Sequence, residues 1–112
     1  MNASLSAFRM AGAIGQYEYR ISGCYEPMEE MIGGVRVFRQ LGGNWWMVYC
    51  QGAWIVQDTS DKGTIKRTIT CFAYVDTPLR PPQLCSTWEV DATEVGFETQ
   101  QLSFTAMSQV SP

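Results

Sequence analysis

Apolar and polar residues alternate over short stretches of this chain, which is the pattern of half-buried β-strands. Glycine, proline and polar residues separate the stretches, and no stretch has the pattern of a long helix. Strands are predicted at residues 17–22, 35–39, 45–50, 53–57, 65–75, 88–90 and 97–104, the last interrupted near Gln100–Gln101. The chain is therefore predicted to be all-β, a small antiparallel barrel or rolled sheet of six to seven short strands.

One domain is expected in a chain of 112 residues. Residues 1–16 are rich in Ala, Ser and Gly and contain no acidic residue, so we assign them to an N-terminal arm. Residues 17–106 form the β domain, and residues 107–112 form a C-terminal tail. Within the domain, Pro27–Met31 is expected to be a loop or a single helical turn. The prolines at positions 78, 81 and 82 predict a stiff extended loop.

The two runs at residues 45–50 and 53–57 predict a hairpin whose turn is centred on Gln51–Gly52. This register places Tyr49 opposite Trp54 and makes both faces of the hairpin apolar. One face carries Trp46, Val48, Cys50, Ala53 and Ile55, and the other carries Trp45, Met47, Tyr49, Trp54 and Val56. An ordinary antiparallel hairpin has one face in water, so both faces of this one need cover.

Two interpretations explain the apolar hairpin. Either the hairpin is central and is covered on both sides by the N-terminal arm or the Pro-rich loop, or one face docks a partner. Leaving three large aromatic side chains in water would lose roughly 10 kcal/mol of the free energy gained by burying apolar surface. This loss is comparable to the stability of a whole domain. Tryptophan and tyrosine are the usual anchors of protein interfaces. The candidate binding residues are Trp45, Met47, Tyr49, Trp54 and Arg39.

Composition narrows the chemistry that the chain can perform. It has no histidine, which excludes a Ser-His-Asp triad, a Cys-His dyad, a histidine base and a His-ligated metal. Glu26, Glu29 and Glu30 indicate a solvated loop edge rather than an acid/base pair. Residues 58–63 lack the spacing of a calcium loop. We therefore predict no catalytic residue, no metal ligand and no cofactor, and a protein that is not an enzyme.

Charge and hydropathy bear on the partners and the compartment. The net charge is −3 and the basic residues are scattered, so no nucleic-acid partner is expected. No stretch approaches the 18 or so apolar residues of a membrane helix, and no secretory signal is recognisable. We expect a soluble protein, with an organelle or the cytoplasm favoured over secretion.

The four cysteines, at positions 24, 50, 71 and 85, form no C-x-x-C pair. Their spacing therefore argues against a zinc ribbon or a thioredoxin-like site. Four cysteines also permit two disulfides, but buried thiols are favoured because no secretion signal is present.

The order of tryptophan, glycine and proline along the chain carries a family resemblance. Its marks are Gly43–Trp46, Gly52–Ile55, Pro81–Pro82 and Trp88–Val90. This order resembles a small β-module, punctuated by tryptophan and glycine, that occurs often in tandem in proteins of phytoplankton-type protists. The similarity covers about Tyr17 to Phe104. The family implies no activity, and the single copy here suits a free-standing binding protein or an accessory subunit.

These observations predict a non-enzymatic binding module. The favoured form is protein–protein docking, with another protein or a second copy as partner, as in a small accessory subunit of a larger assembly. The alternative is a β-barrel that binds a small ligand or a glycan; it predicts a closed barrel with an aromatic-lined cavity. A purely structural module predicts that both faces of the hairpin are covered internally.

Overall fold

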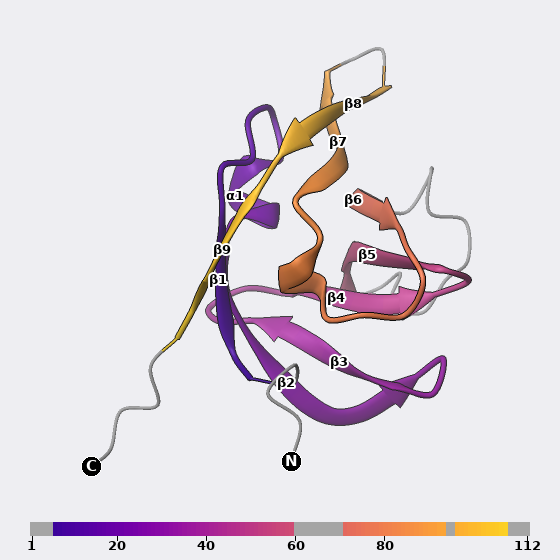
Figure 1. Cartoon of the computed structure of the whole chain (residues 1–112). Coiled ribbons are helices and arrows are strands. Elements are labelled where there is room, and N and C mark those ends of the chain that lie inside the picture. The colour runs from indigo at the N-terminus through magenta and orange to yellow at the C-terminus, as the bar shows by residue number, and fades with distance from the viewer. Residues whose placement is uncertain (1–5, 60–70, 94–95, 108–112) are drawn as a thin grey trace.

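The computed structural model describes residues 6–59, 71–93 and 96–107, which form one antiparallel sheet of nine strands (Figure 1). The strands are β1 (Phe8–Ala11), β2 (Gly23–Ile32), β3 (Val35–Gln40), β4 (Trp45–Cys50), β5 (Ala53–Asp58), β6 (Cys71–Asp76), β7 (Thr87–Thr93), β8 (Gly96–Gln101) and β9 (Ser103–Ala106). The short helices are α1 (Glu18–Ile21) and η3 (Pro82–Leu84). The all-β prediction is confirmed, with more strands than the six to seven expected.

The sheet rolls into a nearly closed barrel because its last strand changes partner. The strand order is β8-β7-β6-β5-β4-β3-β2-β1-β9, so consecutive strands are neighbours until β9 returns to β1. β8 pairs with β7, and β9 pairs with β1. Only Leu102 separates β8 from β9, and its backbone N–H donates to the Ser86 carbonyl oxygen at 2.7 Å. The interruption predicted near Gln100–Gln101 therefore lies at Leu102. There the chain passes from β8, at one edge of the sheet, to β9, at the other edge.

The central hairpin has the predicted register. Tyr49 pairs with Trp54, and Val48 pairs with Ile55. Gln51 and Gly52 at the turn have φ of +50° and +80°, as a two-residue type I′ turn requires. β3 and β6 pair with the two outer sides of this hairpin, so the hairpin is central in the sheet.

Both faces of the hairpin are buried within this chain. The inward face joins the main core, whose rings include Phe8, Tyr25, Phe38, Trp54 and Trp88. The outward face contributes to two smaller clusters: Val37, Trp46 and Val48 in one, and Ala53, Ile55 and Cys71 in the other. The N-terminal segment supplies part of the inner cover, since the Phe8 and Phe38 ring centroids lie 5.0 Å apart.

The prediction of a strand at residues 17–22 is wrong, because Glu18–Ile21 forms helix α1. The Ser22 N–H donates to the Glu18 carbonyl oxygen at 2.8 Å. Ile21 is fully buried, Tyr17 packs against the core, and Tyr19 is exposed. Residues four apart share one face of a helix, so Tyr17 and Ile21 fit a single helical turn as well as they fit one face of a strand.

The N-terminal segment is part of the barrel rather than an arm preceding it. Phe8–Ala11, which we assigned to the arm, is strand β1. Phe8 and Met10 are fully buried and Arg9 between them is exposed. A strand of four residues is too short for its alternation to stand out beside Gly12 and Gly15.

Residues 27–31, expected to be a loop or a helical turn, belong to the ten-residue strand β2. The pairing of β2 with β3 shifts register between Pro27 and Met31. Proline lacks an N–H and is tolerated in a strand at such a bulge. The bulge therefore reconciles Pro27 with a strand.

The four cysteines are free thiols, Cys24 and Cys50 half-buried and Cys71 and Cys85 buried. The first half of the strand predicted at residues 65–75 and residues 108–112 of the predicted tail lie outside the described residues. Among the helices of the described residues, none is long and apolar enough to cross a membrane.

Candidate functional site

The alternating strand directions place the connections of the barrel at two ends. Helix α1 and the β3–β4 turn lie at one end, and we call this the sealed end. The β2–β3 turn at Gly33–Gly34 and the β6–β7 connection, residues 77–86, lie at the other end, which we call the open end (Figure 1). Each end carries exposed apolar side chains, Ile14, Tyr19 and Leu41 at the sealed end and Met31, Leu79 and Leu84 at the open end. The two ends differ in what surrounds their arginines.

At the sealed end, aromatic rings surround the guanidinium of Arg20. Its Cζ atom lies 5.0 to 5.8 Å from four ring centroids, those of Tyr17, Tyr19, Trp45 and Phe72. Its Nε donates a hydrogen bond of 2.8 Å to the Tyr19 hydroxyl oxygen. A guanidinium held over ring faces is stabilised by cation–π attraction. The Arg20 guanidinium is therefore already engaged by side chains of this chain.

Beneath α1, a buried polar network ties the helix to the sheet. The Tyr25 hydroxyl donates to the Ile21 carbonyl oxygen at 2.6 Å. Gln40 Nε2 donates to the carbonyl oxygens of Arg20 and Ser22 and to the Tyr25 hydroxyl, at 3.2 to 3.3 Å. Burial raises the pKa of Tyr25 far above its ordinary value, and the hydrogen bond with Gln40 opposes the rise. This network holds α1 in place.

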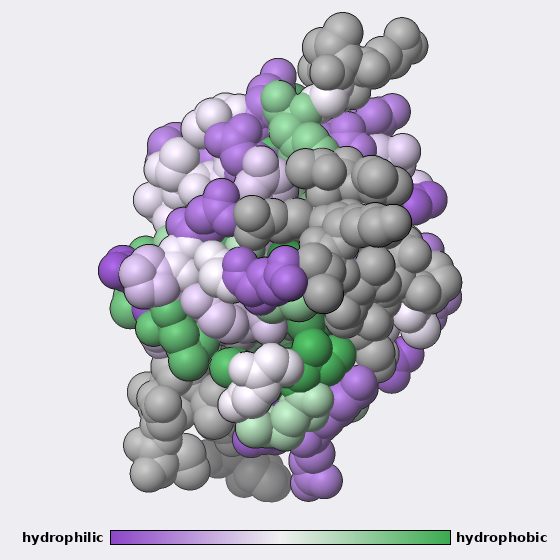
Figure 2. Space-filling model, turned by 90° about the vertical axis from the view of Figure 1, so that its right-hand side faces the viewer, coloured by the Kyte–Doolittle hydropathy of each residue, from purple (hydrophilic) through white to green (hydrophobic). Residues whose placement is uncertain are grey.

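The open end contains a cavity of about 390 Å³, which we call the open-end pocket. Its lining residues are Met31, Gly34, Val35, Arg36, Phe38, Trp54, Leu79, Arg80, Pro81 and Pro82. Phe38 and Trp54 are 0% and 2% exposed and form its inner wall, whereas Met31 and Leu79 are 56% and 60% exposed and stand at its mouth. Figure 2 shows hydrophobic surface low on the face turned to the viewer, at the height of β2 and β3 in Figure 1, beside hydrophilic surface.

Hydrogen bonds fix the Pro-rich loop that forms one wall of the open-end pocket. Trp54 Nε1 donates to the Arg80 carbonyl oxygen at 2.7 Å, and the Tyr49 hydroxyl donates to the Thr77 carbonyl oxygen at 2.8 Å. The Thr77 N–H donates to the Gly52 carbonyl oxygen at 3.0 Å. The loop is therefore anchored to the central hairpin, and the pocket is formed before any ligand arrives.

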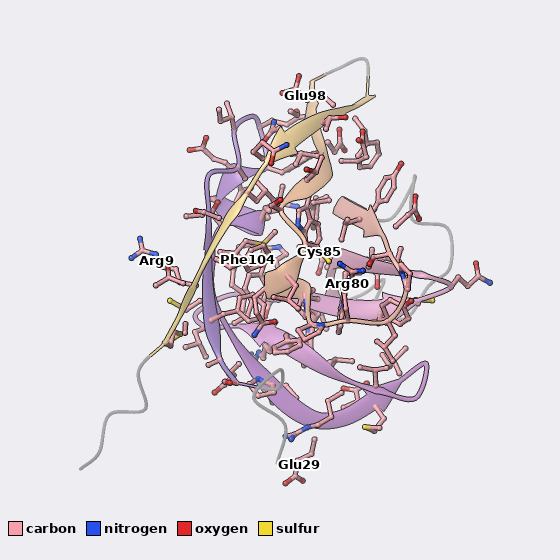
Figure 3. All side chains as sticks on the ribbon, viewed as in Figure 1. Arg9, Glu29, Arg80, Cys85, Glu98 and Phe104 are labelled. Atoms are coloured by element: carbon pink, nitrogen blue, oxygen red, sulfur yellow. The ribbon has the colours of Figure 1, made fainter. Side chains whose placement is uncertain are left out.

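Arginine supplies all the charge in the lining of the open-end pocket. The Arg36 Nε donates to the Met28 carbonyl oxygen at 2.7 Å. Arg80 is exposed, and it lies beside Cys85 in Figure 3. Burial raises the pKa of the Cys85 thiol, and a hydrogen bond with Thr77 and the charge of Arg80 oppose that rise. In the described part of the chain, no three Cys, Asp or Glu side chains are grouped so that they could hold a metal ion.

The five sequence-predicted binding residues do not come together in one site. Trp45 belongs to the sealed end, and Arg39 lies on the outside with its Cζ 5.6 Å from the Trp46 ring centroid. Met47 and Trp54 are 0% and 2% exposed, so neither can anchor a partner on an exposed face as we proposed. Tyr49 packs edge-on against Trp54 at 5.3 Å between centroids. Of the five, Trp54 alone lines the open-end pocket.

Sequence reasoning missed Arg36, Arg80 and Leu79 in the pocket lining. A signal was present, because Leu79 and Met31 are large apolar residues next to turns, where polar residues are usual.

A comparison with protein-family models, with curated proteins and with solved structures found no match for this chain. The resemblance to the protist β-module stays a prediction, and the geometry of the barrel is what bears on function.

Proposed function

We propose that this protein binds a small, predominantly apolar molecule in the open-end pocket. The observation that carries the proposal is the cavity of about 390 Å³, whose accessible lining is mostly apolar and includes Met31, Val35 and Leu79, above the buried rings of Phe38 and Trp54. Ligand pockets typically span about 300–1,000 Å³ and are lined by apolar and aromatic side chains with few polar groups. The pocket lies at the end of a barrel, where such sites are common.

The exposure of the pocket rim supports the same proposal. Met31 and Leu79 keep more than half of their surface in water, and a bound apolar molecule would remove part of that surface from water. Burial of apolar area is favourable by about 25 cal/mol per Å². Docking through the central hairpin lacks this support, because Met47 and Trp54 are already buried in the barrel.

Titration with N-phenyl-1-naphthylamine, a neutral apolar dye that fluoresces in apolar surroundings, tests the proposal. We expect saturable binding of one dye per chain, with a dissociation constant in the micromolar range and quenching of Trp54 by energy transfer. Absence of saturable binding to the folded protein would overturn the proposal.

A matched pair of leucine variants locates the dye. Leu79→Ser removes an apolar side chain from the mouth of the pocket and is expected to weaken binding by about fivefold, the effect of about 1 kcal/mol. Leu84→Ser alters an equally exposed leucine of the same β6–β7 connection that does not line the pocket. Equal weakening by both variants would place the dye elsewhere and contradict the proposal.

A further inference from the structure

The charged residues that line the open-end pocket have one sign, although the chain as a whole is acidic. The net charge is −3, yet the pocket lining contains Arg36 and Arg80 and no Asp or Glu. Scattered surface charges would favour carboxylates in such a protein. Two guanidiniums at one apolar cavity are therefore a specific feature of this end of the barrel.

Both arginines keep hydrogen-bond donors available for a ligand. A guanidinium has five N–H donors. Arg36 commits its Nε to the Met28 carbonyl oxygen, which leaves its terminal NH₂ groups. The structure gives the Arg80 guanidinium no hydrogen bond or ring contact with the described residues, in contrast to the ring-enclosed Arg20 at the sealed end.

The inner wall offers no comparable polar group. The ring of Phe38 is apolar, and the one indole donor of Trp54 is already committed to the Arg80 carbonyl oxygen. Burying an unpaired polar group is unfavourable. A polar end of a ligand therefore belongs with the arginines, and an apolar body belongs against the exposed apolar side chains of the lining, Met31 and Leu79.

We propose that the ligand of the open-end pocket is an amphipathic anion, an apolar body with one carboxylate or similar oxyanion that Arg36 and Arg80 recognise. This inference rests on the proposed function and adds the chemical class of the ligand to it. Arginine suits the role because its planar guanidinium matches an oxyanion with two parallel hydrogen bonds.

A pair of dyes that differ by one anionic group tests the inference. 8-Anilinonaphthalene-1-sulfonate has the same rings as N-phenyl-1-naphthylamine and adds a sulfonate. We expect the sulfonate dye to bind about tenfold more tightly, the effect of one charge-assisted hydrogen bond of about 1.4 kcal/mol. Raising the salt concentration should reduce this preference, because the rim is open to solvent.

Arginine variants identify the groups that read the sulfonate. Arg80→Gln and Arg36→Gln are each expected to weaken the sulfonate dye by about fivefold and to leave the neutral dye within about twofold. Arg36→Lys also loses the bond from Nε to Met28 but keeps the charge, so it should retain most of the preference. Arg9→Gln is the control: Arg9 points outward from β1, away from the β6–β7 connection (Figure 3), and its loss should leave both dyes unchanged.

The outcomes separate the two proposals. If the neutral dye binds and the sulfonate dye binds no better, the proposed function stands and the anionic class of the ligand is wrong. If neither dye binds the folded protein, both fail. If Arg9→Gln weakens the sulfonate dye as much as Arg80→Gln does, the preference comes from overall charge and the inference is overturned.

Discussion

The two ends of this barrel use arginine and aromatic residues in opposite ways. At the sealed end, Arg20 lies among four rings and donates to Tyr19. At the open end, Arg80 stands beside an apolar pocket whose mouth keeps Leu79 in water. The residue types are the same, but rings of the chain contact the Arg20 guanidinium, whereas the structure gives the Arg80 guanidinium no ring contact with the described residues. The difference shows that a cation near aromatic rings indicates a binding site only where the chain does not fill that site itself.

The largest expected effect comes from adding a methyl group at Gly15 in the sealed end. A Cβ there would lie 2.6 to 2.9 Å from atoms of Ala92, two of them backbone, and Gly15 has φ of +124°. Gly15→Ala should lower the free energy of unfolding by about 3 kcal/mol or more, through a clash combined with backbone strain. The measurement is chemical denaturation followed by tryptophan fluorescence.

The matched change at the open end is Gly34→Ala. Gly34 has φ of +80°, but a Cβ there would meet no atom within 4 Å. Only the backbone strain remains, so Gly34→Ala should lower the free energy of unfolding by about 1–2 kcal/mol. If the two variants were equally unstable, the close packing of the sealed end would not be what distinguishes the two ends.

The next effect is a loss of stability at alkaline pH, which tests the buried network below α1. The pKa of Tyr25 is raised in the folded protein, whereas the ordinary value in an unfolded chain is about 10. Below pH 10 both states keep the proton. Above it the unfolded state ionises first, so stability falls as pH rises, by about 1 kcal/mol near pH 11. Denaturation at pH 8 and pH 11 measures this loss.

Tyr25→Phe is the companion variant for the pH experiment. It removes the hydrogen bonds with Ile21 and Gln40 and should cost about 1–2 kcal/mol at pH 8. Its stability should then depend less on pH between 8 and 11 than that of the wild type. Identical pH profiles for the two proteins would contradict the assignment of the alkaline loss to Tyr25.

The sequence best predicted the features that depend on residues close together in the chain. The register of the hairpin followed from two adjacent β-prone runs and the Gln51–Gly52 turn, and the structure confirms it. Helix α1 was missed because Tyr17 and Ile21 share a face in either a strand or a helical turn. Closure of the barrel was beyond local reasoning, since the pairing of Phe8 with Ala106 joins opposite ends of the described chain.

The open-end pocket could not be derived from the sequence for the same reason. Arg36 comes from β3, Trp54 from β5, and Leu79 and Arg80 from the β6–β7 connection. Only the rolling of the sheet brings these segments to one cavity. The apolar hairpin was correctly singled out as needing cover, and the N-terminal segment and the Pro-rich loop supply part of the cover of its inward face, as one of the two interpretations expected.

A smaller effect compares two arginines directly. Arg20→Gln removes a cation from four ring faces and should lower the free energy of unfolding by about 1 kcal/mol. Arg80→Gln removes an exposed cation without such contacts and should change it by less than about 0.5 kcal/mol. Thermal and chemical denaturation of both variants check the order, and a reversed order would contradict the contrast drawn between the ends.

The smallest effect concerns the reactivity of Cys85. Because burial raises the pKa of this thiol, it should react with iodoacetamide more slowly than half-buried Cys24 at pH 8. Arg80→Gln removes a charge that opposes the rise, so alkylation of Cys85 should slow by about twofold. Peptide mass spectrometry over time measures both thiols, and Cys24 serves as the internal control. Faster alkylation of Cys85 in this variant would contradict the prediction.

The exchange of partners at Leu102 also sets the order in which the barrel can assemble. β9 follows β1 by roughly 90 residues in the chain, so one side of β1 stays unpaired until β9 has been synthesised. Bringing such distant segments together is slow because loop closure loses entropy before contacts form. The pairing of β1 with β9 should therefore limit the rate of refolding. Until it forms, the unpaired side of β1 is where a folding intermediate would pair with another chain.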